Sequence, residues 1–154
     1  MDREEILLLL KARFEELQKD LKFKASFKQL DEIFFIKDHY LERKTMPERF
    51  DRDLSHRIAS TFNSWIGTLH NWVIPNPSSL IAITESNQFS DEEKEEMKKV
   101  MKDFMKILSL NSVIGLGKDK KLQAKYFDEA HEIWLKHKGF MLDKINKVHA
   151  YWES

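Results

Sequence analysis

The residues best suited to catalysis are an arginine and a histidine at the start of one helical segment. Arg49 and His56 have six residues between them, so a helix would place both on one side, about two turns apart. A guanidinium can stabilise the charge of a phosphorane, and an imidazole can move a proton near neutral pH. The pair therefore suits RNA cleavage without a metal ion.

This spacing resembles the Arg/His pair of the HEPN-type helical ribonucleases. Lys144 and His149 form a similar pair with four residues between them, in which lysine replaces arginine. Phe50 directly follows Arg49, where the family usually has a polar residue. The resemblance implies a metal-independent ribonuclease that uses Arg49 and His56, with RNA as a partner only in that case. The alternative is that both side chains simply solvate the first turns of their helix.

A second pattern pairs a carboxylate with an imidazole one helical turn later. Asp53 with His56 and Asp128 with His131 have the i, i+3 spacing that helical bundles use for metal ions. Di-iron bundles use Glu at these places, with a further Glu from each of two other helices. Neither pair lies on the apolar side of its helix, so we predict no metal site and no cofactor. We expect Asp53 to pair instead with Arg57 at i+4.

A third candidate site is aromatic. Trp65, His70 and Trp72 lie in the longest charge-free stretch of the chain, between Ile58 and Thr84. Aromatic walls with a few polar groups are typical of small-molecule pockets. A helical sensor that binds a small ligand through these three residues is therefore a third hypothesis. The alternative is that His70 is hydrogen-bonded in or beside the core.

The sequence Gly115-Leu116-Gly117-Lys118 has part of the pattern of a phosphate-binding loop. A P-loop has Ser or Thr after its lysine and follows a strand, whereas Asp119 follows here and a helix precedes. We therefore predict only a turn between helices, over residues 112–118. The lysines that follow could contact phosphates, although the acidic residues among them favour a solvated face; they are Lys118, Lys120, Lys121 and Lys125.

The element that must position most of these candidates is a helix over Phe50–Val73. Its bulky residues recur every three or four positions: Phe50, Leu54, Ile58, Phe62, Trp65, Leu69 and Trp72. Its other side carries Ser60, Asn63, Ser64 and Gly67, where a solvated helix normally has Lys or Glu. We therefore predict a central helix at about 46–74 that begins after a Thr45 cap and has neighbours on more than one side.

Start and stop signals predict the surrounding helices. Asp2, Ser26, Asn76 and Ser90 are good caps, and the helices should span about 2–21, 26–43, 77–86, 90–111 and 119–152. In the short helix we expect Leu80, Ile81 and Ile83 to be buried. The last helix should be continuous, with a bend near Gly139. The expected fold is all-α, a single-domain bundle of five to six helices over residues 1–154.

Composition limits the classes of function. The chain has 26 basic and 26 acidic residues, which argues against dedicated binding of duplex DNA. It has no cysteine, and we identify no signal peptide and no membrane-spanning stretch, so we expect a cytoplasmic protein. The wide apolar faces of several helices and the zero net charge favour association. Our first hypothesis is a non-enzymatic helical module that binds a protein partner, most simply a second copy of itself as a homodimer.

Overall fold

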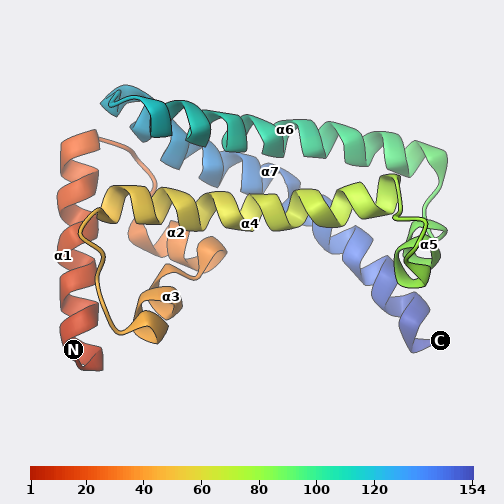
Figure 1. The fold of residues 1–154 in the computed structure, drawn as a ribbon, viewed down its shortest axis with the longest axis horizontal. Coiled ribbons are helices and arrows are strands. Elements are labelled where there is room, and N and C mark those ends of the chain that lie inside the picture. The colour runs from red at the N-terminus through yellow and green to blue at the C-terminus, as the bar shows by residue number, and fades with distance from the viewer.

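The computed structural model describes all 154 residues as helices and short connections, without a strand (Figure 1). The helices are α1 (Arg3–Leu21), α2 (Phe27–Phe34), α3 (Ile36–Arg43), α4 (Phe50–Val73), α5 (Leu80–Ser86), α6 (Asp91–Leu116) and α7 (Lys120–Glu153). The prediction of an all-α bundle is confirmed. There are seven helices rather than five or six.

Three long helices run along the length of the molecule, and shorter ones gather at its two ends. In Figure 1, α4 lies between α6 above it and α2 below it, and α7 passes behind. Helix α1 stands across the end of α4 with α2 and α3 beside it, while α5 lies at the opposite end with the end of α7. A cluster of 27 buried hydrophobic residues forms one core, to which every helix except α5 contributes.

The predicted helix over residues 26–43 is wrong because the chain breaks at Phe35. This residue has φ 52°, in the left-handed region, and it separates α2 from α3. Phe34 and Ile36 are both fully buried, whereas two residues apart on a continuous helix would point about 200° from each other. The break therefore lets both side chains enter the core. Arg57 supports it, since its Nε donates a hydrogen bond to the Phe34 carbonyl at 3.1 Å.

The central helix starts later than predicted. Thr45 caps nothing, and α4 begins at Phe50 with Arg49 in the N-cap position and no side-chain cap. Lys44 has φ 60° and turns the chain out of α3, so residues 45–49 serve as a connection that runs beside the middle of α1. The Pro47 carbonyl in this connection accepts a hydrogen bond from Arg13 at 3.4 Å. The predicted end of the helix, before Pro75, is confirmed.

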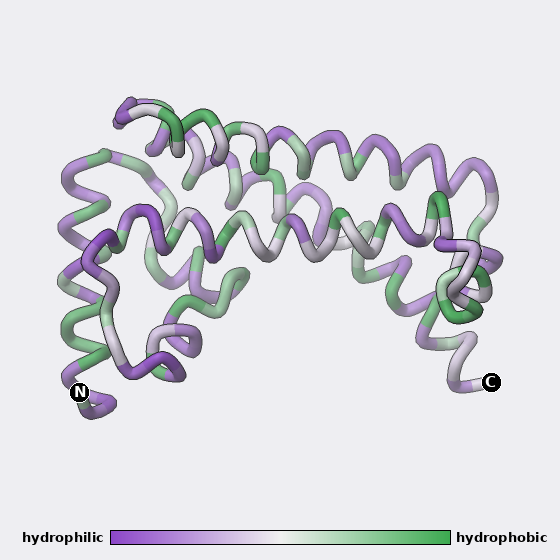
Figure 2. Tube along the Cα trace, viewed as in Figure 1, coloured by the Kyte–Doolittle hydropathy of each residue, from purple (hydrophilic) through white to green (hydrophobic).

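Neighbours contact α4 on more than one side, but one of its faces is open. Phe62 packs on Phe104 of α6 with ring centroids 5.2 Å apart, and Trp65 packs on Trp134 of α7 at 5.7 Å. The uncharged residues of the other side are exposed; they are Ser60, Asn63, Ser64 and Gly67. The lack of charge on that side is therefore not explained by burial within this chain. In Figure 2, green positions alternate with hydrophilic ones along α6 and α7, as expected for helices buried on one face.

The short helix α5 differs from its prediction in two ways. It begins at Leu80 rather than Pro77, and the Ser79 hydroxyl caps it by accepting the Ala82 N–H at 3.1 Å. Its Leu80 and Ile81 are exposed, while Ala82 and Ser86 face the core. A seven-residue helix has room to bury only one narrow side, and in α5 the smaller residues occupy it.

The turn between the two last helices is shorter than predicted. Helix α6 continues to Leu116 because Ile114 is buried and holds the final turn on the core. Residues 112–116 are therefore helical, and only Gly117–Asp119 form the connection. The predicted continuity of the last helix is confirmed, since α7 passes through Gly139 without interruption.

Candidate functional site

The predicted Arg49 and His56 pair lines one pocket at the start of α4. The pocket has a volume of about 430 Å³, and its other walls come from the end of α6 and from Gln123 of α7. Arg49 precedes the first turn of α4 and His56 lies in its second turn, so both side chains reach the same opening. The structure thus brings together the two residues that the ribonuclease hypothesis requires.

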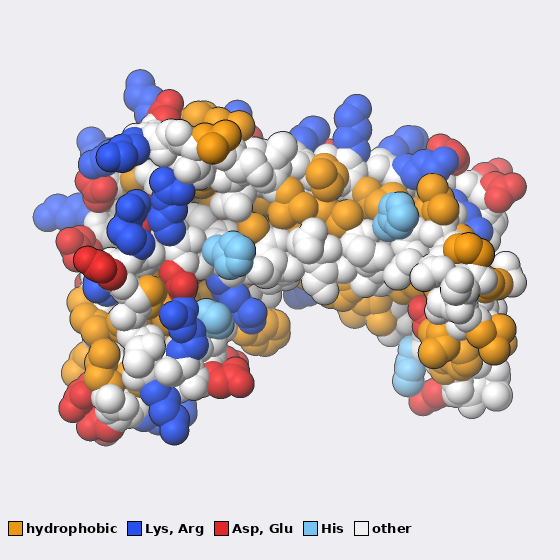
Figure 3. Space-filling model, in the orientation of Figure 1, with side chains coloured by type: hydrophobic (Ala, Val, Ile, Leu, Met, Phe, Trp, Pro, Cys, Tyr) orange, Lys and Arg blue, Asp and Glu red, His pale blue; other side chains and the backbone are white.

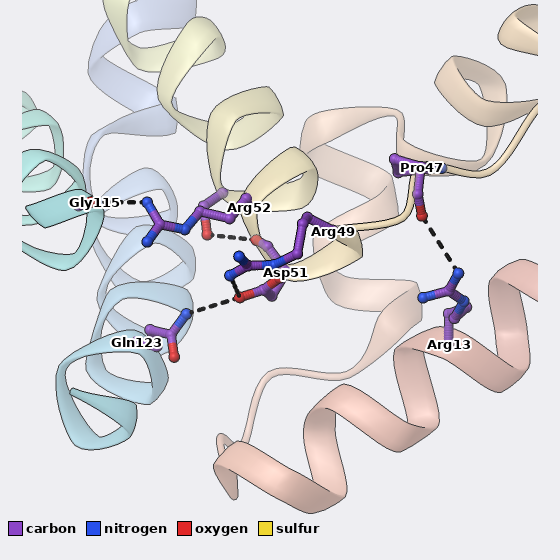
Figure 4. A network of polar contacts seen from close by, with 8 residues as sticks. Arg13, Pro47, Arg49, Asp51, Arg52, Gly115 and Gln123 are labelled. Atoms are coloured by element: carbon purple, nitrogen blue, oxygen red, sulfur yellow. Dashed lines mark hydrogen bonds and ion pairs between the residues drawn. The ribbon is translucent and has the colours of Figure 1, made fainter. Parts of the chain in front are cut away.

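Polar contacts hold the residues at the start of α4 in place (Figure 4). Arg49 lies 3.4 Å from the Asp51 carboxylate, which also accepts a hydrogen bond from Gln123 at 3.2 Å. Arg52 donates to the carbonyl of Gly115 at 2.9 Å and so ties α4 to the last turn of α6. Burial raises the pKa of Asp51, but the hydrogen bonds, led by that from Arg49, lower it more. Asp51 is therefore ionised and offsets part of the local positive charge.

The Asp53 carboxylate on the same helix is held by α3. It accepts the hydroxyl of Tyr40 at 2.6 Å and a guanidinium N–H of Arg43 at 2.8 Å. The predicted pair with Arg57 is therefore wrong, because α3 brings better-placed donors to Asp53 and Arg57 binds the Phe34 carbonyl instead. Burial and the hydrogen bond to Asp53 raise the pKa of Tyr40 far above its usual value. Asp53 therefore links α4 to α3 through its hydrogen bonds with Tyr40 and Arg43.

The other Asp/His pair is also built around a structural carboxylate. Asp128 accepts the backbone N–H groups of Lys24 and Ala25 at 2.9 and 2.8 Å. It thereby fixes the connection between α1 and α2 against α7. Nothing in the local sequence indicated this role, because its partners lie about a hundred positions away. No group of three or more His, Asp or Glu residues lies close enough together to hold a metal ion.

The two residues of the Lys144 and His149 pair lie in different environments. Lys144 is almost fully buried, and its ammonium lies 3.0 Å from the Glu93 carboxylate. His149 is exposed and pairs with Glu153 at 3.2 Å. Lys144 therefore serves the contact between α6 and α7, and the two side chains do not share an environment.

The three residues of the aromatic hypothesis have different partners. Trp65 is half-buried against Trp134. Trp72 is buried, donates to Glu85 at 3.1 Å and packs on Phe89 at 5.1 Å. His70 is exposed. None of the three lines either of the two main pockets, so a ligand site formed by them stays a prediction.

The opposite end of the molecule exposes large apolar side chains. Leu80 and Ile81 of α5 are 79% and 64% exposed, and Ile74 just after α4 is 63% exposed. Trp152 of α7 is half exposed, and its indole N–H donates to Glu85 of α5 at 2.8 Å, which places it beside this helix. Orange side chains accordingly cover this end in Figure 3. We call these four residues, Ile74, Leu80, Ile81 and Trp152, the α5 apolar surface.

The chain is thus an all-α protein with a polar pocket at one end and an apolar surface at the other. None of its helices combines the length and the apolar character needed to cross a lipid bilayer. No protein-family model matches the sequence, and neither a curated protein nor a solved structure matches the chain.

Proposed function

We propose that this protein is a non-enzymatic helical module that acts by association, with a second copy of itself as the partner. The observation that carries the proposal is the α5 apolar surface, where Leu80 and Ile81 stand exposed side by side. Isolated exposed apolar residues are ordinary on proteins, but adjacent ones on a short element are typical of contact surfaces.

Physical considerations favour a symmetric dimer. Full burial of one Leu or Ile side chain contributes about 1.5–3 kcal/mol, and a twofold axis doubles each contribution because both copies present the same surface. The zero net charge of the chain leaves little long-range repulsion between copies. The absence of cysteine suits a reducing compartment, and we propose that association takes place in the cytoplasm.

Sedimentation velocity across micromolar concentrations tests this function. We expect the wild-type protein to dimerise and the double variant Leu80→Asp/Ile81→Asp to weaken the dimer by about tenfold or more. Leu116→Asp is the matched control, since Leu116 is 93% exposed at the opposite end of the molecule. A wild-type protein that stays monomeric throughout, or equal effects of the two substitutions, would contradict the proposal.

A second candidate function rests on the pocket that Arg49 and His56 share. We propose a metal-independent ribonuclease as the alternative, in which the Arg49 guanidinium stabilises the phosphorane and the His56 imidazole moves a proton. His56→Ala should abolish cleavage of single-stranded RNA while the fold survives, because His56 is exposed. His149→Ala, from the pair of Lys144 with His149, is the control. Unchanged cleavage in the His56 variant would end this alternative.

A further inference from the structure

A second pocket, larger than the one that Arg49 and His56 share, adjoins it at the start of α4. It has a volume of about 780 Å³ and lies where α1, the first turn of α4 and the connection between α6 and α7 meet. Figure 4 shows this region, with Arg49 and Asp51 between α1 and Gln123 of α7. Seven of its 16 lining residues are cationic and four are acidic. The cations are Arg13, Lys19, Lys22, Arg49, Arg52, Lys118 and Lys120.

Several of these cations have no carboxylate partner. Lys120 pairs with Asp20 at 2.8 Å and Arg49 with Asp51 at 3.4 Å, whereas no ion pair involves Lys19, Lys22 or Lys118, which are exposed. The chain as a whole is neutral, so an excess of positive charge around one pocket is a local feature. Three separate segments supply it, which is not expected of a single solvated helix face.

Hydrogen bonds within the protein hold Arg13 and Arg52 in place, and both retain N–H donors for a ligand. Arg13 and Arg52 each give one hydrogen bond to a backbone carbonyl, those of Pro47 and Gly115. A guanidinium has five N–H groups, so most of their donors remain for a ligand, and the bonds already made reduce the entropy lost on binding. The start of α4 adds to the positive potential, since no side chain caps it.

We propose that this pocket binds a small molecule that carries two or more linked phosphate groups, of the size of a nucleoside polyphosphate. Arginines and lysines are the side chains that bind phosphate oxygens best, and the volume falls within the range of about 300–1,000 Å³ that small-molecule sites occupy. Leu17, Leu21 and Phe50 provide an apolar wall for the rest of such a ligand. This site is independent of the proposed dimer surface, which lies at the other end of the molecule.

A small ligand fits the charge distribution better than a long nucleic acid does. An RNA strand gains affinity by neutralising phosphates along a cationic track. Here the cations surround one pocket, and Glu16, Asp20 and Glu48 interrupt them. The neutral chain also offers little long-range attraction to a long polyanion.

Isothermal titration calorimetry at low ionic strength, with inorganic tripolyphosphate and with ATP as probes, tests the proposal. Lys22→Glu/Lys118→Glu reverses two exposed charges that lie outside the helices, so the fold should be unaffected. Lys99→Glu/Lys102→Glu is the matched control, because these lysines are exposed on α6, form no ion pair and do not line the pocket. We expect both probes to bind the wild-type protein, with affinity weakened about tenfold or more in the pocket variant and changed less than about twofold in the control.

Three results would overturn the proposal. The first is that neither probe binds the wild-type protein, and the second is that both double variants bind the probes equally. The third is that single-stranded RNA binds through Lys22 and Lys118 while tripolyphosphate and ATP do not, which would assign the pocket to RNA. Sedimentation of the pocket variant keeps this test separate from the proposed function, since the dimer should be unchanged.

Discussion

The imidazole Nε2 of His137 lies 2.7 Å from Oδ2 of Asp103, and this contact joins the middle of α7 to the middle of α6. His137 is the one histidine that the core buries. Lys106 and Lys136 also donate to the Asp103 carboxylate, at 3.0 and 3.3 Å. Burial raises the pKa of Asp103, but these hydrogen bonds, led by that of His137, lower it more, so that it falls well below its usual value.

This network predicts a loss of stability in Asp103→Asn that depends on pH. Because the pKa of Asp103 is lower in the folded state than the ordinary 3.8, its ionised form stabilises the fold above that pH and the stabilisation disappears as pH falls. We expect Asn to cost about 1–3 kcal/mol at pH 7 and much less in acid. Urea unfolding at both pH values measures this. Glu95→Gln, in an exposed i, i+3 pair with Lys98, should cost less than about 1 kcal/mol; equal losses in the two variants would contradict the prediction.

The break between α2 and α3 predicts a stabilising substitution. Phe35 adopts φ 52°, which costs an L-residue with a side chain about 1–2 kcal/mol relative to glycine. Its ring is 58% exposed, so little burial would be lost. We expect Phe35→Gly to raise the free energy of unfolding by about 0.5–1 kcal/mol, measured by urea unfolding. Phe35→Ala should give no such gain, and destabilisation by both substitutions would show that the ring is needed.

The break at Phe35 could not be predicted from the local sequence, whereas the helix caps could. Ser26 and Ser90 cap their helices as predicted, each in a capping box with the residue three positions later, because a cap depends only on neighbouring residues. The interruption at Phe35 depends on Arg57, which supports the Phe34 carbonyl from another helix. Local periodicity does not contain such information, so the sequence predicted one helix where there are two.

The candidate sites show the same difference between features set by neighbouring residues and features set by distant ones. The spacing of Arg49 and His56 on one helix was enough to predict that they would share a side, and they line one pocket. The larger cationic pocket combines Arg13, Arg52 and Lys118 from three separate segments. Only the folded arrangement of α1, the start of α4 and the connection between α6 and α7 brings them together, so no motif in the sequence marked the pocket.

The role of Asp128 can be separated from metal binding by mutation. Its carboxylate accepts two backbone N–H groups, from Lys24 and Ala25, and Asp128→Ala would leave them without this partner. We expect a loss of about 1–3 kcal/mol in urea unfolding. His131→Ala should change stability by less than about 1 kcal/mol, since no hydrogen bond of its ring supports the fold. A chelator that lowers the stability of the wild-type protein as much as Asp128→Ala does would instead indicate a bound metal.

The Glu93 carboxylate forms ion pairs with two lysines of α7. Lys147 lies 2.8 Å from its Oε1 and Lys144 lies 3.0 Å from its Oε2. Ser90 donates its backbone N–H to the same carboxylate at 3.1 Å. The hydrogen bond from Lys147 is the largest cause that lowers the pKa of Glu93, which falls from 4.5 to about 2 although burial opposes the change.

Replacement of either lysine by methionine should therefore change the pKa of Glu93. Lys147→Met and Lys144→Met should each raise the pKa of Glu93, followed by carboxyl-carbon NMR, because each lysine donates a hydrogen bond that lowers it. The stability that Glu93 provides is present above pH 4.5 and is lost as pH falls toward 2. In both variants the free energy of unfolding should therefore decrease less over this pH range than in the wild-type protein. Lys99→Met, at an exposed position of α6 without an ion pair, controls for the loss of a lysine charge. If neither variant raised the pKa of Glu93, the two lysines would not be the cause of its low value.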